Sequence, residues 1–132
     1  CGTATTYTNT VVTTQFTGTL AGLGHAIDNL KINGTSNYVG LIGRTSSTVG
    51  TNTIRDLGIT NAIISASGRS NVGILAGAAY NTKVSHVYST GTVVGGGSTG
   101  GLIGSGGLID YSYSSAGVTG GTNVGGLIGN SA

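Results

Sequence analysis

The chain has 132 residues, including 27 glycines, and only 6% of its residues are charged, which leaves a net charge of +2. This length fits a single domain, and the low net charge with periodic β-branched residues excludes a disordered chain. The lysines and arginines are scattered, at positions 31, 44, 55, 69 and 83, without the basic cluster that nucleic-acid binding needs. No uninterrupted apolar stretch reaches the roughly 20 residues that span a bilayer.

The composition favours short strands joined by tight turns. Val, Ile, Thr and Tyr prefer strands, whereas helix-forming residues are scarce and methionine is absent. Asparagine and glycine separate the apolar segments, as at Asn33-Gly34, Asn71 and Asn81. Both residues tolerate positive φ, so these positions are expected to be turns.

A phrase that closes on glycine recurs along the chain. It reads Tyr-Val-Gly-Leu-Ile-Gly at 38–43, Val-Gly-Ile-Leu-Ala-Gly at 72–77, Gly-Gly-Leu-Ile-Gly at 100–104 and Val-Gly-Gly-Leu-Ile-Gly at 124–129. Its closing glycines lie 34, 27 and 25 residues apart. Self-similarity at a period of roughly 20–50 residues indicates a repeat architecture.

A second phrase keeps nearly the same period. It occurs at 27–32, 54–59, 84–88 and 109–113. Aligning these copies predicts which side chains stack from one repeat to the next. Arg55 is expected near Asp28. His86 is expected near Asp56, with Tyr111 next to His86.

Together the two phrases predict an all-β fold, a right-handed parallel β-helix (β-solenoid). About four to five coils would stack roughly 4.8 Å apart, and parallel crossovers are overwhelmingly right-handed. We expect one domain, part of a longer chain, with coils at 1–24, 25–52, 53–82, 83–106 and 107–132. The long first spacing predicts an inserted loop around Arg44 to Asn52.

Apolar positions of both phrases are expected in the core. They are the valine, leucine and isoleucine positions of the glycine-closed phrase together with Ile27, Leu30, Ile54, Leu57, Val84 and Ile109. The closing glycines are expected to form the corners of the coils: Gly43, Gly77, Gly104 and Gly129.

Residues 16–30 read Phe-Thr-Gly-Thr-Leu-Ala-Gly-Leu-Gly-His-Ala-Ile-Asp-Asn-Leu. This segment resembles the opening motif of filamentous-haemagglutinin-like adhesins, and the later Gly-Gly-Leu-Ile-Gly units resemble the GLUG repeat of bacterial surface proteins. The resemblance implies a β-solenoid, an extracellular or bacterial cell-surface location, and an adhesive role. It does not specify what is bound.

Acidic residues are too few to favour an enzyme. A strip of Asp28, Asp56 and His86 is the one catalytic arrangement that the alignment allows, and a polar ladder that fixes register is the preferred interpretation. Zinc and calcium sites need three or more converging ligands. We therefore expect no catalytic, metal or cofactor-binding residues, and a glycan-active enzyme is a weaker alternative.

Threonines raise the alternative of ice binding. Thr-x-Thr pairs occur at 3/5, 6/8/10, 17/19, 51/53 and 90/92. They do not recur at one fixed place in every repeat, so ordinary exposed strand positions are preferred. Cys1 allows no internal disulfide, and the sequence leaves open whether it carries lipid.

The sequence therefore predicts a structural and adhesive module, a stiff presentation rod on the outside of a bacterium. Its expected partner is a host or neighbouring cell surface, through glycan or protein, with neither nucleic acid nor a membrane span. The main alternative is a self-assembling extracellular filament or sheath, because open solenoid ends can template further pairing.

Overall fold

The computed structural model describes residues 5–48 and 50–131, and within these ranges the chain is all-β. Parallel strands stack as a β-solenoid of about four turns, which confirms the predicted fold class. No helix in the described part of the chain is long and apolar enough to cross a membrane. Cys1, whose lipidation the sequence leaves open, lies outside the described residues.

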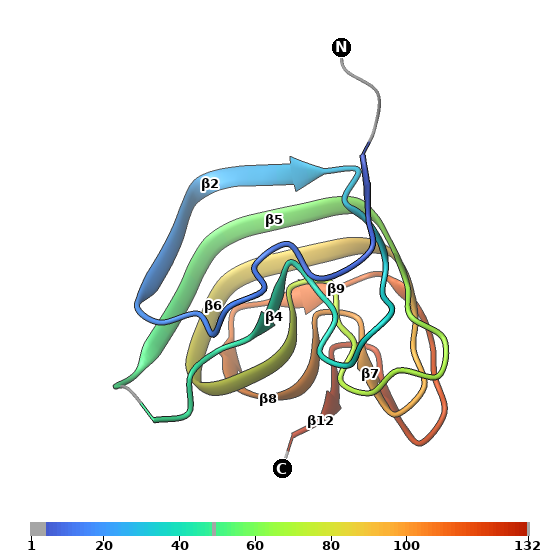
Figure 1. The fold of residues 1–132 in the computed structure, drawn as a ribbon. Coiled ribbons are helices and arrows are strands. Elements are labelled where there is room, and N and C mark those ends of the chain that lie inside the picture. Colours follow the sequence, from blue (N-terminus) through green and yellow to red (C-terminus); the bar gives the residue numbers. More distant parts are fainter. Residues whose placement is uncertain (1–4, 49, 132) are drawn as a thin grey trace.

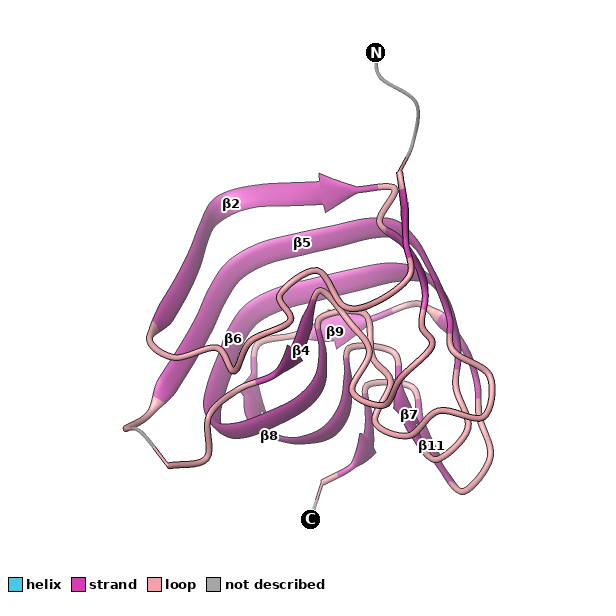
Figure 2. Cartoon of the chain, viewed as in Figure 1, coloured by secondary structure: helices cyan, strands magenta, loops and turns pink. Residues whose placement is uncertain are grey.

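The strands vary from short bridges to long bent segments that run around the coil. They are β1 (Thr6–Tyr7), β2 (Thr19–Asp28), β3 (Lys31–Asn33), β4 (Ile42–Arg44), β5 (Asn52–Ser65), β6 (Ala76–Val94), β7 (Ser98–Gly100), β8 (Ile103–Asp110), β9 (Tyr113–Ser114), β10 (Gly117–Thr119), β11 (Asn123–Gly125) and β12 (Ile128–Asn130). Figure 1 shows β2, β5, β6 and β8 stacked in that order, and Figure 2 shows loops closing each coil.

Successive coils pair in register through the middle of the solenoid. Ile54 pairs with Val84, and Val84 pairs with Ile109. In the glycine-closed phrase Ile42 pairs with Ala76, which pairs in turn with Ile103. Both repeated phrases therefore align as predicted from the second coil onward.

The core is a column of aliphatic side chains inside the coils. The predicted core residues Leu30, Ile54, Leu57 and Val84 are buried, while Ile27 and Ile109 are partly buried and pack against them. Most of the largest fully buried side chains are isoleucines. Because the coils stack in register, Ile54 lies between Leu20 and Val84 of the adjoining coils.

The prediction that the closing glycines form corners is wrong. They lie inside strands β4, β6, β8 and β12. A Cβ atom on Gly77 would lie 2.6 Å from backbone atoms of Tyr38 and of Asn71. Gly104 and Gly129 likewise leave no room for a Cβ atom, because backbone of the preceding coil lies too close, whereas a Cβ atom on Gly43 would meet the side chain of Thr10.

Residues with positive φ form the corners instead. Asn29 and Asn61, at φ 60° and 51°, turn successive coils at one corner. Tyr38 and Asn71, at φ 63° and 57°, do so at another. Asparagine tolerates this left-handed conformation better than most residues, so it recurs at these turns.

The predicted stacking of Arg55 near Asp28 is also wrong. Arg55 pairs with Ala21, and Asp28 pairs with Thr60. Residues 22–24 of β2 form a bulge opposite the single residue Asp56. The bulge shifts the register of the following residues of the first coil against the second. The phrase at 27–32 consequently aligns with 59–64, five residues later than the sequence alignment placed it.

The inserted loop lies where the spacing predicted it. Phe16 pairs with Thr45, whereas Thr19 pairs with Thr53. Between these two pairs the first coil has three residue steps, from Phe16 to Thr19, and the second coil has eight, from Thr45 to Thr53. The extra residues fall between Thr45 and Thr53, which confirms the loop around Arg44 to Asn52.

Leu57→Ala is expected to lower the free energy of unfolding by about 2–5 kcal/mol, because it removes a buried side chain and leaves a cavity. Urea denaturation followed by far-UV circular dichroism measures this loss. Leu108, which is 75% exposed, is the matched control. A Leu108→Ala loss equal to that of Leu57→Ala would contradict the assignment of the core.

Gly91→Ala is expected to destabilise the fold far more than Gly58→Ala. Gly91 has φ 128°, and a Cβ atom there would collide with the backbone of Ala62. The three atoms nearest to a Cβ atom on Gly58 all belong to the ring of Tyr88, which is a side chain and can yield more easily than backbone. We expect losses of about 2–4 kcal/mol and under about 1 kcal/mol respectively, measured by thermal and urea denaturation. Equal losses of unfolding free energy in Gly91→Ala and Gly58→Ala would contradict this prediction.

Candidate functional site

One corner of the solenoid carries large side chains on left-handed backbone. Leu23, Asp56, His86 and Tyr111 have φ values of 55°, 56°, 54° and 45°. We call this set the exposed corner; it takes one residue from each of four successive coils. A left-handed conformation costs an ordinary L-residue roughly 1–2 kcal/mol. Aspartate and histidine tolerate this conformation better than most residues, so the cost falls mainly on Leu23 and Tyr111.

Register brings these residues into one column. Arg55 pairs with Ser85 and Leu57 with Val87, so Asp56 lies level with His86. The imidazole of His86 in turn stacks on the ring of Tyr111, with centroids 5.0 Å apart and planes 12° apart. The predicted neighbours Asp56–His86 and His86–Tyr111 are therefore confirmed.

A second aromatic pair runs beside the first. Tyr88 pairs with Tyr113, and their rings stack with centroids 5.4 Å apart and planes 12° apart. Tyr113 covers one face of Tyr88, while the phenol end of Tyr88 reaches over Gly58 of the preceding coil. The four rings make an aromatic patch, of which Tyr111 and Tyr113 are 78% and 60% exposed.

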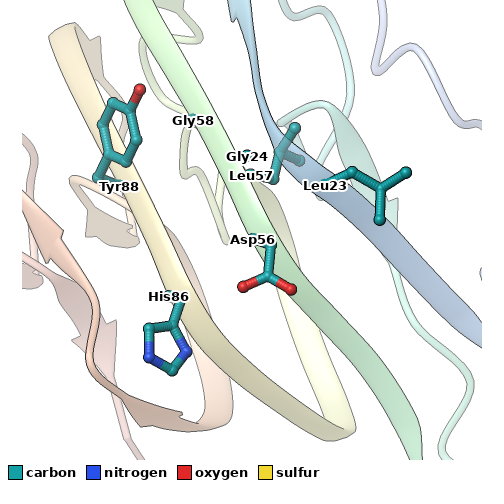
Figure 3. Close-up of a pocket in the computed structure, with 7 residues that line it drawn as sticks. All are labelled: Leu23, Gly24, Asp56, Leu57, Gly58, His86 and Tyr88. Carbon is teal, nitrogen blue, oxygen red and sulfur yellow. The ribbon is translucent and has the colours of Figure 1, made fainter.

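A groove of about 310 Å³ lies along this patch (Figure 3). Its lining crosses three coils: Leu23, Gly24, Asp56, Leu57, Gly58, His86 and Tyr88. In Figure 3, Asp56 lies between His86 on one side and Leu23 on the other. The groove therefore combines an apolar wall, two ring systems and one carboxylate.

Few polar contacts restrain the groove. Arg55 Nε lies 3.9 Å from an Asp56 carboxylate oxygen, and both side chains are about half exposed, so this pair is weak. The hydroxyl of Ser85 lies 2.8 Å from His86 Nδ1. One more ion pair, Lys83 with Asp110 at 3.6 Å, lies on the adjoining strands.

The structure does not bring Asp28 into line with Asp56 and His86, so the predicted three-residue strip is wrong. Asp28 lies at the next corner along the coil, where Thr60 and Asn61 donate hydrogen bonds of 2.7 and 2.8 Å to its Oδ1. Asn29 donates another, of 2.9 Å, to Oδ2. These bonds, led by that of Thr60, lower the pKa of Asp28. The carboxylate therefore fastens a corner.

A second hollow, of about 300 Å³, lies on another face beside Tyr38 and Arg44. The Arg44 guanidinium lies 5.4 Å from the centre of the Tyr38 ring. Ser36 donates a 2.8 Å hydrogen bond to Asn9 Oδ1 across this hollow. Thr10 and Asn37, which also line this hollow, are hydrogen-bonded to backbone groups, so it offers less to a ligand than the groove at the exposed corner.

Metal and ice chemistry find little support in the described residues. No group of three His, Cys, Asp or Glu side chains there is close enough to hold a metal ion. Thr19 pairs with Thr53, but the next residues in that column are Lys83 and Leu108. The threonine ladder is therefore broken after two coils.

Sequence reasoning found part of the groove and missed the rest. The alignment placed Asp56, His86 and Tyr111 together. It missed Leu23 because residues 22–24 have no counterpart in later coils, and it missed Tyr88 because nothing marked that side chain as lying over Gly58. The recurring Tyr-x-Tyr and His-x-Tyr spacing, at 111–113 and 86–88, was the available signal.

The chain is similar to halomucin of Haloquadratum walsbyi (strain DSM 16790 / HBSQ001), with 42% identity over 101 residues that make up 73% of this chain. The chain spans only 1% of the length of that relative. No family model matches the chain. No solved structure matches it either.

The pKa of Asp28 is expected to rise when Thr60 is replaced by Val, because the largest cause of its lowering is lost. Since the folded-state pKa is lowered, these hydrogen bonds stabilise the fold at neutral pH. That contribution disappears as the pH falls through the folded-state pKa. Carboxyl-detected NMR titration measures the shift. Thr92→Val, at an exposed position level with Ile63 and past the corner at Asn61, is the control. An unchanged Asp28 titration in Thr60→Val would contradict the assignment.

Proposed function

We propose that this chain is a structural module of a secreted or cell-surface protein, a short section of a stiff solenoid. The observation that supports this most is the continuous parallel pairing from β2 through β5, β6 and β8 to β12. Each coil is held by the coil before it, so a longer run of coils makes a continuous rod in which the same pairing is repeated along the axis.

The similarity to halomucin fits this role. A segment that matches 1% of a much longer relative is what a repeating structural section would give. The relative is named as a mucin. On that basis we propose an extracellular location for this chain. The resemblance of residues 16–30 to adhesins favours the same setting and adds adhesion to the proposal.

Self-assembly into a filament is the second candidate, and one observation favours it. Strand β2 is long and pairs only with β5 among the described strands, so one of its edges has no partner strand in this structure. An exposed strand edge can pair with another chain. Contacts of this head-to-tail kind do not close and therefore build fibres.

Analytical ultracentrifugation and negative-stain electron microscopy across a concentration series separate the two candidates. The structural module is expected to sediment as one chain of 12.8 kDa at every concentration. Filaments that lengthen with concentration would contradict it and support assembly. Ala26→Lys, which adds a charge to the exposed side of β2, should dissolve such filaments, whereas Ser65→Lys, at an exposed position of β5 that is paired on both sides by Asn33 and Val94, should leave them intact.

A further inference from the structure

We propose that the groove at the exposed corner binds the pyranose ring of a sugar. Leu23 of the first coil forms one wall, and His86 and Tyr88 of the third coil form the other. The second coil supplies the floor, with Leu57 and Gly58, and the carboxylate of Asp56 (Figure 3). Nothing in the structural role requires this groove, so the inference stands or falls separately from the proposed function.

The dimensions suit one small ring. Adjacent strands lie about 4.8 Å apart, and the ring of Tyr88 reaches from the third coil over Gly58 of the second, so the gap to Leu23 on the first coil is less than two strand spacings and has room for one ring only. The volume of about 310 Å³ is at the lower end of ligand pockets. A protein partner would instead need a contact of roughly 800 Å² on each side, which this groove does not provide.

The chemistry of the walls suits a sugar. One face of Tyr88 is covered by Tyr113 and the phenol end of its other face packs over Gly58, so the ring lines the groove with the rest of that second face and its edge. An aromatic face carries partial negative charge, which attracts the C–H groups on the apolar side of a pyranose. Leu23 closes the opposite side.

Polar groups at the edge complement the hydroxyl groups of such a ring. Asp56 is 43% exposed at its side chain and only loosely paired with Arg55, so its carboxylate can accept hydrogen bonds from two hydroxyls. That carboxylate also disfavours phosphorylated ligands. The hydroxyl of Ser85 bonds to His86 Nδ1 and thereby fixes the orientation of the imidazole beside the groove.

The backbone at this corner supports a role beyond folding. Leu23, Asp56 and His86 all adopt positive φ, whereas Asn29 and Asn61 turn the same strands at the next corner with a residue suited to it. Strained residues held by the surrounding structure cluster at binding sites. Of the three residues, Leu23 is the type least suited to this backbone conformation, and its exposed side chain lines the groove.

The test is NMR titration of the ¹⁵N-labelled chain with methyl β-D-glucopyranoside, methyl β-D-galactopyranoside and methyl α-D-mannopyranoside, up to about 50 mM, because single-ring sugars bind on the order of millimolar. At least one glycoside is expected to shift the amide signals of residues 56–58 and 86–88. Leu23→Asn and Asp56→Asn should each weaken that binding about tenfold, and asparagine suits the left-handed backbone at both positions.

Leu108→Asn is the matched control, because Leu108 is 75% exposed, close to the 79% of Leu23, and lies outside the groove. It should leave the dissociation constant within about twofold, a difference too small to count as a lost contact. Amide spectra of each variant report whether it is folded. The proposal would be overturned by the absence of shifts with every glycoside, by shifts centred elsewhere, or by binding of phenol without binding of any glycoside. It would also be overturned if Leu23→Asn and Asp56→Asn bound the glycoside as tightly as the unsubstituted chain.

Discussion

Parallel hydrogen bonding between successive coils is the interaction on which the rest of this structure depends. It fixes each residue against its counterpart one coil away, as in the column of Ile54, Val84 and Ile109. Core packing follows because aliphatic residues meet aliphatic residues. The aromatic stacks follow for the same reason, since His86 reaches Tyr111 only when the backbones are in register. A slip of one residue would turn core side chains outward.

The same constraint explains how a groove can form on a chain so poor in charged and aromatic residues. Three coils each contribute a small part of the lining, and none of the parts is distinctive alone. Gly58 makes room for the ring of Tyr88 from the next coil, and the left-handed turns at Leu23, Asp56 and His86 set the directions of those three side chains. Register, rather than any local motif, assembles the site.

The fold was predictable from the sequence because the glycine-closed phrase is repeated with little change. The first coil was less predictable. Ile-Asp-Asn at 27–29 resembles both Ile-Arg-Asp at 54–56 and Ile-Thr-Asn at 59–61, and the second match is correct because Asn29 and Asn61 share a left-handed turn. The closing glycines were wrongly assigned to corners because a tight turn and a close backbone contact both require glycine, and the sequence alone does not distinguish the two roles. The groove includes Leu23 and Gly24 of the bulge at 22–24. This bulge occurs once and is therefore not predicted by the repeat pattern.

Stacked coils also determine how such a chain responds to tension. Bonds between coils run along the axis of the solenoid, so a pull along that axis loads one coil at its edge and peels it away from the next. Between β6 and β8 one coil takes 25 residues from Lys83 to its partner Leu108. Folded, it adds about 4.8 Å to the length; stretched, it adds about 85 Å. A solenoid of this kind is stiff under small forces and lengthens coil by coil under large ones, absorbing mechanical work before any covalent bond is strained.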